Sequence, residues 1–488
     1  MEENGRVVIM KFGGTSVADA EAIARVVRHV MARAGRHSSN AQPVVVVSAL
    51  AGVTDRLLAL ATAAEQADAQ ALRAGVEALR ARHLQVAAEV APKPIADLAT
   101  AIDAEFAAIG ALLDTAAAAR HASPAVVDAV AGIGELLSSR IVHAALARAG
   151  APAAWVDARR VIVTDDHFTA AIPLVADTET AIAREIRPLL AAGQMPVVGG
   201  YIAATRDGIP TTLGRGGSDY SAALLGAGLD ACEIQIWTDV DGMMTTDPRM
   251  VSGARVVSQL SFGEASALAH FGAKVLHPGT ILPAVAKGIP VRILNSRRFD
   301  GRGTEIASVA SGGSNVAAIA CKRRVTLVNF TSTRALMVWG FLRRVFEAFE
   351  RHRTPVDLLA MSEAGVSVVI DDDRRLEAIV QGLADIAVAH VERAMAIVCV
   401  VGDGLREEPR LAERMMGALD RFQVWMVSQT ASQRSLAVVL RDTDAAAATS
   451  RLHTEFFGAR GPEEPLRHSR AADTAARAVR GPVREIRP

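Results

Sequence analysis

Cysteine and aromatic residues are scarce in this sequence. Among its 488 residues there are three cysteines, and only 4% of the residues are Phe, Trp or Tyr. Cys232, Cys321 and Cys399 are far apart, and none belongs to a CxxC pair or to a Cys/His group with zinc spacing. A disulfide framework is therefore excluded, and we expect buried free thiols in a reducing cytoplasm.

The sequence also has no excess of positive or negative charge, and it has no long apolar run. Lys plus Arg and Asp plus Glu number 53 each, so the formal net charge is zero. This balance gives no support to a nucleic-acid partner or to an anionic membrane surface. No apolar stretch reaches the roughly 18 residues of a membrane-spanning helix, and residues 2–4 are too polar to open a signal peptide. We therefore expect a cytoplasmic protein without membrane or nucleic-acid partners.

The residues that are present favour a multidomain α/β protein. Half of them are hydrophobic, which is enough for the cores of two to four domains. Helical patterns, including an Ala-rich region at 55–150, alternate with apolar runs that are typical of parallel strands buried on both faces. These strands are expected at 7–10, 43–48, 155–157, 161–163, 196–201 and 233–238. The alternation predicts a three-layer α/β domain with a mainly parallel sheet over residues 6–307.

The pattern changes after a Gly- and Ser-rich linker at 311–315. Strands are expected at 316–321, 325–330, 366–370, 394–401 and 436–440, and helices at 340–352 and 409–422. We interpret this weak repeat as two small α+β units of ferredoxin-like type, 316–390 and 391–457. Residues 458–488 are rich in Arg and Pro and lack aromatic residues, so they are predicted to be a disordered, solvated tail.

The first segment with chemical potential is residues 11–16, which read KFGGTS between a strand and a helix. Two glycines let backbone N–H groups approach a phosphate, and the helix N-terminus adds partial positive charge. Lys11 adds a mobile full charge that suits a transferring phosphoryl group. The spacing matches neither a Walker A loop nor a dinucleotide fingerprint. Taken alone, the two glycines are equally typical of a plain tight turn.

A second glycine-rich turn occupies residues 211–221, which read TTLGRGGSDYS before an apolar helix. Arg215 can bind a carboxylate through two parallel hydrogen bonds. Ser218 and Asp219 fall at the helix start, where either would serve as a cap. Capping explains one of them but not three glycines and an arginine in one loop, so an anion-binding function is favoured.

Two further segments are ambiguous by themselves. Residues 237–249 read WTDVDGMMTTDPR, a polar loop after a strand, where open α/β sheets bind ligands. Arg249 could reach a nucleotide phosphate there, although a solvated turn explains the loop equally well. Residues 271–278 read FGAKVLHP, in which Lys274 is the one cation among apolar residues. Most such lysines only extend their ammonium group to the solvent. His277 is more typical of a structural histidine than of a base.

In this order, the four segments resemble the aspartate kinase branch of the amino-acid kinase family. The resemblance covers about residues 6–457, and the C-terminal units look like that family's paired ACT domains. It implies transfer of the ATP γ-phosphoryl group to the β-carboxylate of L-aspartate, the first step of lysine, threonine and methionine biosynthesis. A carboxylate is already a nucleophile at neutral pH, so no general base is needed.

The resemblance also implies roles for particular residues. Lys11 would stabilise the transferring phosphoryl group, and Asp219 would organise the lysines and the phosphate loop. The aspartate contacts would be Thr54, Glu135, Arg215 and Ser218, with Glu135 pairing with the α-amine. The ATP contacts would be Lys11, Gly13, Gly14, Thr15, Thr238, Asp239, Arg249 and Lys274. We see no carboxylate cluster that requires a metal ion, so Mg²⁺ is expected to be held mainly by phosphates and water.

Regulation and assembly are implied by the same resemblance. An amino-acid effector would bind near Gly340, Phe341, Leu342, Val356, Asp357, Ser362 and Glu363. Alternatively, Asp357 and Glu363 are turn and cap residues without a ligand. Residues 337–339 replace a more polar stretch of lysine-inhibited relatives, so the effector's identity stays open. Met244 stands where relatives often have a Tyr near the nucleotide, which leaves that nucleotide contact open. Exposed sheet edges in both units predict a homodimer or a dimer of dimers.

Two other functions remain open at this point. One is a kinase for another acid, such as glutamate or acetylglutamate, although Glu135 and Arg215 favour a free α-amino acid. The other is a non-catalytic amino-acid sensor on a kinase scaffold, against which the intact Lys11, Asp219 and Lys274 argue. Release of ADP with L-aspartate compared with L-glutamate would separate these readings.

Overall fold

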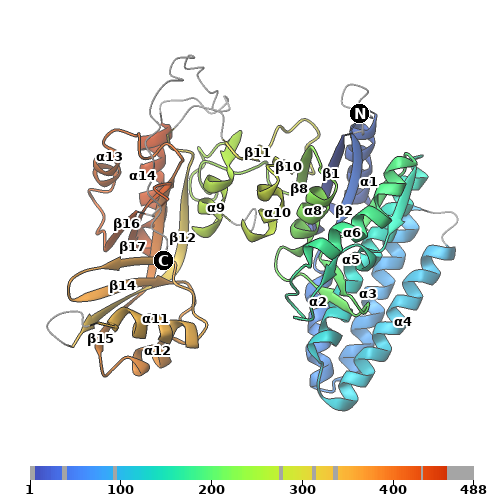
Figure 1. Ribbon diagram of the computed structural model, residues 1–488, viewed down its shortest axis with the longest axis horizontal. Coiled ribbons are helices and arrows are strands. Elements are labelled where there is room, and N and C mark those ends of the chain that lie inside the picture. The colour runs from blue at the N-terminus through green and yellow to red at the C-terminus, as the bar shows by residue number, and fades with distance from the viewer. Residues whose placement is uncertain are drawn as a thin grey trace.

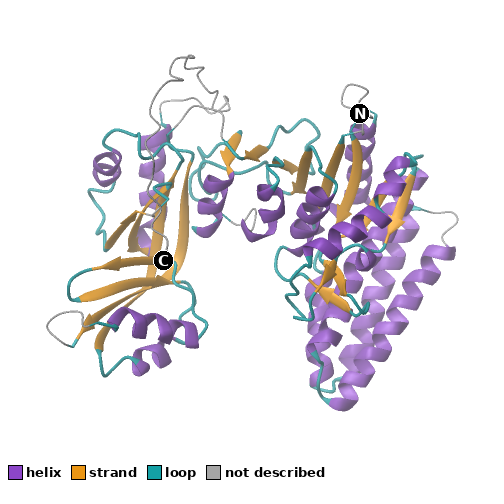
Figure 2. Cartoon of the chain, in the orientation of Figure 1, coloured by secondary structure: helices purple, strands orange, loops and turns teal. Residues whose placement is uncertain are grey.

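The computed structural model describes residues 6–35, 41–91, 96–273, 278–309, 315–333, 339–429 and 432–458. The N-terminal domain and the C-terminal sheet lie at opposite ends of the molecule, and helix α9 (Phe262–His270) lies between them (Figure 1). Long helices dominate the N-terminal end and strands the C-terminal end (Figure 2). After Gly458, the tail predicted at 458–488 lies outside the described residues.

An eight-stranded sheet forms the centre of the N-terminal domain. Its order is β3 (Ala153–Val156), β5 (Met195–Gly199), β2 (Gln42–Val47), β1 (Val7–Phe12), β8 (Glu233–Thr238), β10 (Val291–Asn295), β11 (Thr304–Ala307) and β9 (Gln259–Ser261). The first six strands are parallel, and only the β10–β11 pairing is antiparallel. Every residue of β1 is buried, as expected for the centre of a parallel sheet.

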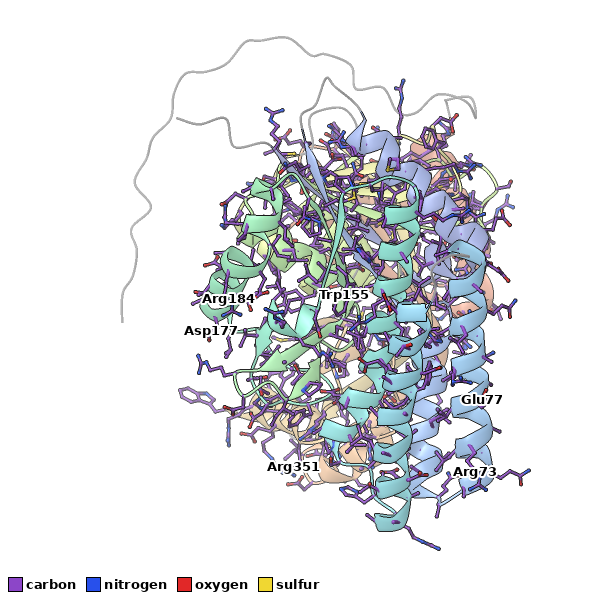
Figure 3. All side chains as sticks on the ribbon, turned by 90° about the vertical axis from the view of Figure 1, so that its right-hand side faces the viewer. Arg73, Glu77, Trp155, Asp177, Arg184 and Arg351 are labelled. Atoms are coloured by element: carbon purple, nitrogen blue, oxygen red, sulfur yellow. The ribbon has the colours of Figure 1, made fainter. Side chains whose placement is uncertain are left out.

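Helices cover both faces of this sheet, which confirms the predicted three-layer α/β domain with a mainly parallel sheet. One face packs against α1 (Ala20–Ala34), α2 (Val53–Glu65), α3 (Ala69–Val90), α4 (Ala96–Ala119) and α5 (Pro124–Arg148). The other face packs against α6 (Val175–Glu185), α7 (Arg187–Ala191), α8 (Gly217–Gly228) and α10 (Leu282–Ala286). In Figure 3, the labels at Arg73 and Glu77 mark α3, and those at Asp177 and Arg184 mark α6 on the other side.

Short elements complete the N-terminal domain. A three-stranded sheet contains β4 (Val163–Thr164), β6 (Ile202–Thr205) and β7 (Pro210–Thr212). Turns of 3₁₀ helix lie at η1 (Gly14–Val17), η2 (Ala158–Arg160) and η3 (Pro278–Ile281). Of the strand expected at 161–163, only the last residue belongs to β4, because residues 161 and 162 connect η2 to β4. Both glycine-rich segments lead directly into helical turns, as their sequences predicted.

The C-terminal sheet is antiparallel and has six strands. Its order is β13 (Leu358–Met361), β14 (Gly365–Ile370), β12 (Ala318–Ser332), β15 (Ala387–Val401), β17 (Ser435–Arg441) and β16 (Met426–Gln429). Its helical elements are α11 (Phe341–Arg351), α12 (Leu376–Gly382), α13 (Leu411–Ala418), η4 (Asp442–Asp444) and α14 (Ala445–Phe457). An α/β fold followed by an α+β module was therefore the correct prediction of fold class.

Strand β12 differs from the prediction of two strands at 316–321 and 325–330. It is one strand of 15 residues, and its pairing with β15 shifts register between Arg323 and Leu327. Arg324 has a φ of 59°, in the left-handed region. A bulge with this geometry lets a strand turn without ending, which explains why three charged residues at 322–324 do not break it.

The two long strands join both small units. The first half of β12 pairs with the second half of β15, which in turn pairs with β17. The second half of β12 pairs with β14. This register favours counting residues 318–323 with the second unit, while the limits 6–307, 316–390 and 391–457 stay a prediction.

The C-terminal sheet is strongly coiled. Its two edge strands, β13 and β16, contact each other. Edge strands of a flat sheet of six strands would lie about 24 Å apart at the usual strand spacing. Leu358 and Met426 accordingly share one core cluster, while α11 and α12 cover one part of the sheet and α13 and α14 another. All three cysteines are free; Cys399 is buried, and Cys232 and Cys321 are half-buried.

Candidate active site

An open pocket of about 660 Å³ lies at the carboxyl ends of the central strands. Its walls come from the turns after β1, β2 and β5, from α5, and from the start of α8. Seven residues predicted for the site line this pocket: Lys11, Gly14, Thr54, Glu135, Arg215, Ser218 and Asp219. Because β2 and β8 flank β1 on opposite sides, the pocket lies beside the switch point at which such sheets bind ligands.

Lys11 and Asp219 form an ion pair in the pocket. The Lys11 Nζ atom lies 2.6 Å from Asp219 Oδ1, and both side chains are largely buried. Lys11 comes from the end of β1, and Asp219 from the first turn of α8. The carboxylate thus fixes the ammonium at the start of a helix, where the partial positive charge of the helix end also favours an anion.

Glu135 is a buried carboxylate with unused hydrogen-bonding capacity. It is only 4% exposed, accepts a hydrogen bond from the backbone N–H of Ala49, and lines the pocket. Its Oε2 atom has no hydrogen-bond partner among the described residues. Burial raises the pKa of Glu135 to about 8, and the nearby Lys11 opposes this shift only weakly. A cationic ligand would supply the missing partner and ionise the group.

Small residues allow the walls of the pocket to approach one another. A Cβ atom on Gly134 would lie 2.8 Å from the Ala49 Cβ, so this glycine brings α5 onto the turn after β2. A Cβ atom on Gly200 would lie 2.7 Å from the Ser218 Cβ, so this glycine brings the turn after β5 onto the start of α8. The two contacts bring Glu135 and Ser218 to the same pocket.

Arg215 lies at the tip of the second glycine-rich turn. Gly214 and Gly216, its neighbours, have φ angles of 70° and 73°, in the region that favours glycine. Arg215 is exposed, lines the pocket, and has no ion pair among the described residues. Thr54 lies in the first turn of α2 on the same pocket. A free guanidinium and a buried carboxylate therefore face one cavity.

The predicted nucleotide contacts are only partly gathered. Gly13 donates its backbone N–H to Trp237 O at 3.0 Å, which joins the first glycine turn to the end of β8. Thr15 is exposed in η1, Thr238 is the last residue of β8, and Asp239 follows it; none of the three lines the pocket. Arg249, whose side chain is 87% exposed, forms a two-point ion pair with Asp247. Lys274 and His277 lie outside the described residues.

The residues predicted for an effector do not form one cluster. Gly340, with a φ of 88°, precedes α11, and Phe341 is buried in the core with Leu342 and Val356 beside it. Asp357 forms a buried ion pair of 2.7 Å with Lys322, so it is not a free partner for an ammonium group. Ser362 and Glu363 lie in the turn at the opposite end of β13. Met337 and Val338 lie outside the described residues, and Trp339 is fully exposed.

Two residues of the pocket were missed by the sequence reasoning. Asp128 is buried on α5, and Tyr201 follows β5 with a φ of 68°. Neither lies in a glycine-rich motif. A signal for Asp128 was available, because it precedes Glu135 by seven residues and so shares its helix face.

The donor set does not include a dedicated metal site. Among the described residues, no group of three or more His, Cys, Asp or Glu side chains is arranged to hold a metal ion. Asp219 offers one carboxylate in the pocket, and Lys11 already pairs with it. A cation at this site would thus depend mainly on oxygen ligands that a phosphorylated molecule brings with it.

Comparisons with known proteins agree with this geometry. The model of the amino acid kinase family matches residues 6–295, and that of the ACT domain matches residues 398–456. This chain belongs to the amino acid kinase family. Within that family its relatives are aspartokinases. Among the described residues, no helix has the length and apolar character needed to cross a membrane.

Two aspartokinase sequences and one solved structure illustrate the relationship. Lysine-sensitive aspartokinase 3 of Escherichia coli is 35% identical over 460 residues, covering 92% of this chain and 99% of that protein. Aspartokinase 3, chloroplastic, of Arabidopsis thaliana is 33% identical, covering 92% of this chain and 81% of that protein. The crystal structure of E. coli aspartokinase III with aspartate and ADP is 34% identical, with a TM-score of 0.79 over 92% of this chain and all of that one.

Proposed function

We propose that this protein is an aspartate kinase that transfers the γ-phosphoryl group of ATP to the β-carboxylate of L-aspartate, giving 4-phospho-L-aspartate and ADP. The observation that carries the proposal is the pairing of charges in one pocket. In the part of the chain that the structure describes, the buried Oε2 atom of Glu135 has no hydrogen-bond partner and the Arg215 guanidinium has no ion-pair partner. An amino acid with one ammonium group and two carboxylates is complementary to both.

The chemistry requires that two anions meet. A carboxylate oxygen of the substrate attacks the γ-phosphorus in line, and the bond to the β–γ bridging oxygen breaks as ADP leaves. Lys11, held by Asp219, lies where positive charge would lower the repulsion between them. The backbone N–H groups of the two glycine-rich turns and the N-terminus of α8 add partial positive charge. No proton has to be removed from the nucleophile, so no base is required.

Mg²⁺ fits this pocket only as a companion of the nucleotide. It would supply further neutralisation of the phosphate charge. Thr238, Asp239, Arg249 and Lys274 are proposed as nucleotide contacts, and the exposed ion pair of Arg249 with Asp247 can open at little cost. Thr54 and Ser218 are proposed as further contacts of the substrate aspartate.

Regulation by an amino acid is proposed from the C-terminal units. An aspartokinase III of E. coli that is 34% identical to this chain has been solved with lysine and aspartate. We propose an amino-acid effector for this chain too, bound near α11 and the turn at Ser362 and Glu363. Because Asp357 pairs with Lys322, it would be a ligand only if that ion pair opened.

A homodimer or a dimer of dimers is proposed through the C-terminal units. The two edge strands of their sheet carry exposed apolar side chains, Leu359 and Met361 on β13 and Val427 on β16, and Val388 is exposed on β15. Edge strands with such side chains need a cover in a soluble protein. Light scattering at micromolar concentration tests this, and a monomer would contradict it.

The activity is tested by ADP release with MgATP and a set of acceptors. L-Aspartate should support rapid release, whereas L-glutamate and N-acetyl-L-glutamate should give little above the rate without acceptor. Faster release with N-acetyl-L-glutamate would contradict the role of Glu135 as an ammonium partner. No release with any acceptor would favour a non-catalytic sensor.

A further inference from the structure

Asp128 is a carboxylate that the proposed mechanism does not use, although it is buried beside the substrate pocket. It is 1% exposed. Its Oδ2 atom accepts hydrogen bonds from the backbone N–H groups of Thr169 at 2.8 Å and Thr212 at 3.1 Å. Its Oδ1 atom accepts a third, of 2.6 Å, from the Thr212 hydroxyl. Burial raises the pKa of Asp128, and the hydrogen bonds from Thr212 and Thr169 oppose that shift.

Two of these hydrogen bonds, both from Thr212, tie the second glycine-rich turn to helix α5. Thr212 is the last residue of β7, and Arg215 follows it by three positions. Two backbone hydrogen bonds hold this turn. Leu213 N donates to Tyr201 O at 2.9 Å, and Gly217 N donates to Gly214 O at 3.0 Å, which closes the turn around Arg215. A turn fixed at its base and closed on itself leaves its tip, at Arg215, little freedom.

Helix α5 also carries Glu135, the carboxylate on which the substrate ammonium would be bound. Asp128 and Glu135 are seven residues apart, which is two helical turns, or about 10 Å along the axis, on one face. One rigid helix therefore fixes both the carboxylate that receives the ammonium and the base of the turn that carries the guanidinium. These two charges together fix where the α-carbon of a bound amino acid lies, and so how far its side chain has to reach to Lys11.

Tyr201 supports the same connection from the other side. Its side chain lines the pocket, and its hydroxyl lies within hydrogen-bonding reach of the Thr212 side chain. Its backbone N–H donates to the Ser221 hydroxyl in α8 at 2.9 Å. A non-glycine residue with a φ of 68° persists only where its surroundings hold it, and these contacts do so.

We propose that Asp128 and Thr212 are positioning residues that hold Arg215 in place relative to Glu135, so that the α-amino-acid group of the substrate is bound at a fixed reach from Lys11. This reach selects aspartate over amino acids with longer side chains. The inference rests on the proposed function. Neither residue needs to touch the substrate; both act through the turn at 213–217. Discrimination against one extra methylene is worth only roughly tenfold to two-hundredfold in an enzyme site, so a small displacement of Arg215 removes much of it.

The decisive variant is Thr212→Val, which keeps the shape of the side chain and removes the hydroxyl that donates to Asp128. We expect the KM for L-aspartate to rise about tenfold, the effect of losing one hydrogen bond to a charged group. The ratio of kcat/KM for L-aspartate to that for L-glutamate should fall by a similar factor. The KM for ATP should stay within about twofold of wild type, because the nucleotide side does not depend on this turn.

Two companion variants sharpen the result. Thr212→Ser keeps the hydroxyl and should restore both aspartate KM and selectivity. Thr211→Val is the matched control, because the Thr211 hydroxyl is also buried on β7 but bonds to the Thr164 hydroxyl at 2.7 Å instead. It should leave KM values and selectivity near those of wild type, even if it lowers the melting temperature as much as Thr212→Val does.

Several outcomes would overturn the inference. Equal increases in the KM of ATP and aspartate in Thr212→Val would make the residue merely structural, as would the same changes in Thr211→Val. If Thr212→Val does not fold, Asp128→Asn decides. Its amide has one acceptor oxygen where Asp128 uses two oxygens for three donors, so at least one of these hydrogen bonds is lost and selectivity should fall by about threefold. Unchanged selectivity refutes the inference. A wild-type protein without aspartate-dependent ADP release would instead refute the proposed function.

Discussion

The substrate side and the nucleotide side of the active site are held in different ways. The substrate side consists of the turn after β2, helix α5 and the turn before α8, and its hydrogen bonds run within the N-terminal domain. The loop after β8, which carries the proposed nucleotide contacts Asp239 and Arg249, is hydrogen-bonded instead to the C-terminal units. The backbone O of Thr245 accepts from Ile319 N of β12 at 2.7 Å, and the Thr245 hydroxyl lies 2.9 Å from His453 Nε2 of α14.

Helix α9 makes the same kind of connection, and Lys274 follows it in sequence. Glu264 at its start accepts a hydrogen bond from Asp403 N at 2.8 Å, and His270 Nε2 at its end lies 3.2 Å from Asp357 O. The position of α9 between the two parts of the molecule is visible in Figure 1. The contacts that join the parts thus fall on segments next to the proposed nucleotide contacts.

This difference indicates which side of the active site the C-terminal units can affect directly. A change in their arrangement reaches the loop after β8 and the segment after α9 directly, through packed elements and hydrogen bonds. It reaches Glu135 and Arg215 only through the rest of the domain. Coupling between two sites requires a structural element whose position depends on both sites. Among the described residues, the contacts with the C-terminal units supply such an element on the nucleotide side and not on the substrate side. Variants on each side should therefore separate the two KM values.

The largest effect is expected where the two sides meet, at Lys11. Lys11→Ala removes the charge beside the transferring phosphoryl group and should lower kcat about a thousandfold. Circular dichroism should show an intact fold, because the ion pair with Asp219 lies at the pocket and not in the core. A folded variant that retains more than about a tenth of the wild-type activity would rule out the role of Lys11.

The substrate side should respond to Glu135→Gln with a large change in one KM. The amide keeps the shape and removes the charge that binds the ammonium, so the KM for aspartate should rise by about thirtyfold or more, with the KM for ATP nearly unchanged. Steady-state kinetics with each substrate varied in turn measures both. Similar increases for both substrates would make Glu135 a structural residue of α5.

Of the two KM values, only the KM for aspartate should depend on pH through Glu135. Because burial raises the pKa of Glu135 to about 8, its carboxyl is protonated in the free protein below that pH. Binding of an ammonium requires the ionised form, so the KM for aspartate should fall as pH rises toward 8, by up to about tenfold per unit, and then level off. Glu135→Gln should remove the dependence, and its survival in that variant would assign it to another group.

The nucleotide side should respond more weakly, to a change made in the C-terminal units. His453→Ala removes the contact of α14 with the Thr245 hydroxyl and should raise the KM for ATP by about three- to fivefold, the effect of one neutral hydrogen bond. The KM for aspartate should not change. His143→Ala, which removes a half-buried histidine of α5 that contacts Ala153 O, is the control. An effect on aspartate instead would contradict the division of the site.

The sequence was most informative where local chemistry decides the structure. The strand at Glu233–Thr238 and the two glycine-rich turns follow from apolar runs and from neighbouring glycines, all visible over a few residues. The convergence of Lys11, Glu135 and Arg215 on one pocket needed more than local signals, because it depends on strand order. The family resemblance supplied that order, and the pocket confirms that these residues come together.

What escaped the sequence depends on distant partners. Asp128 looked like one polar residue on an Ala- and Val-rich helix, and its role comes from Thr212, 84 positions away. Asp357 was predicted near the effector as if its carboxylate were free. The sequence does not show that it pairs with Lys322, which lies on another strand. The continuity of β12 through residues 322–324 likewise depends on the bulge in its pairing with β15. Short-range patterns carry no information on any of these contacts.

Trapping the product with hydroxylamine tests the central claim most directly, because it reports which carboxylate has been phosphorylated. With MgATP, L-aspartate and hydroxylamine, the protein should form the β-hydroxamate of aspartate in step with ADP release, and Glu135→Gln should form the same product only at high aspartate concentration. The α-hydroxamate, or ADP release without any hydroxamate, would contradict the binding of aspartate between Glu135 and Arg215 with its β-carboxylate toward Lys11.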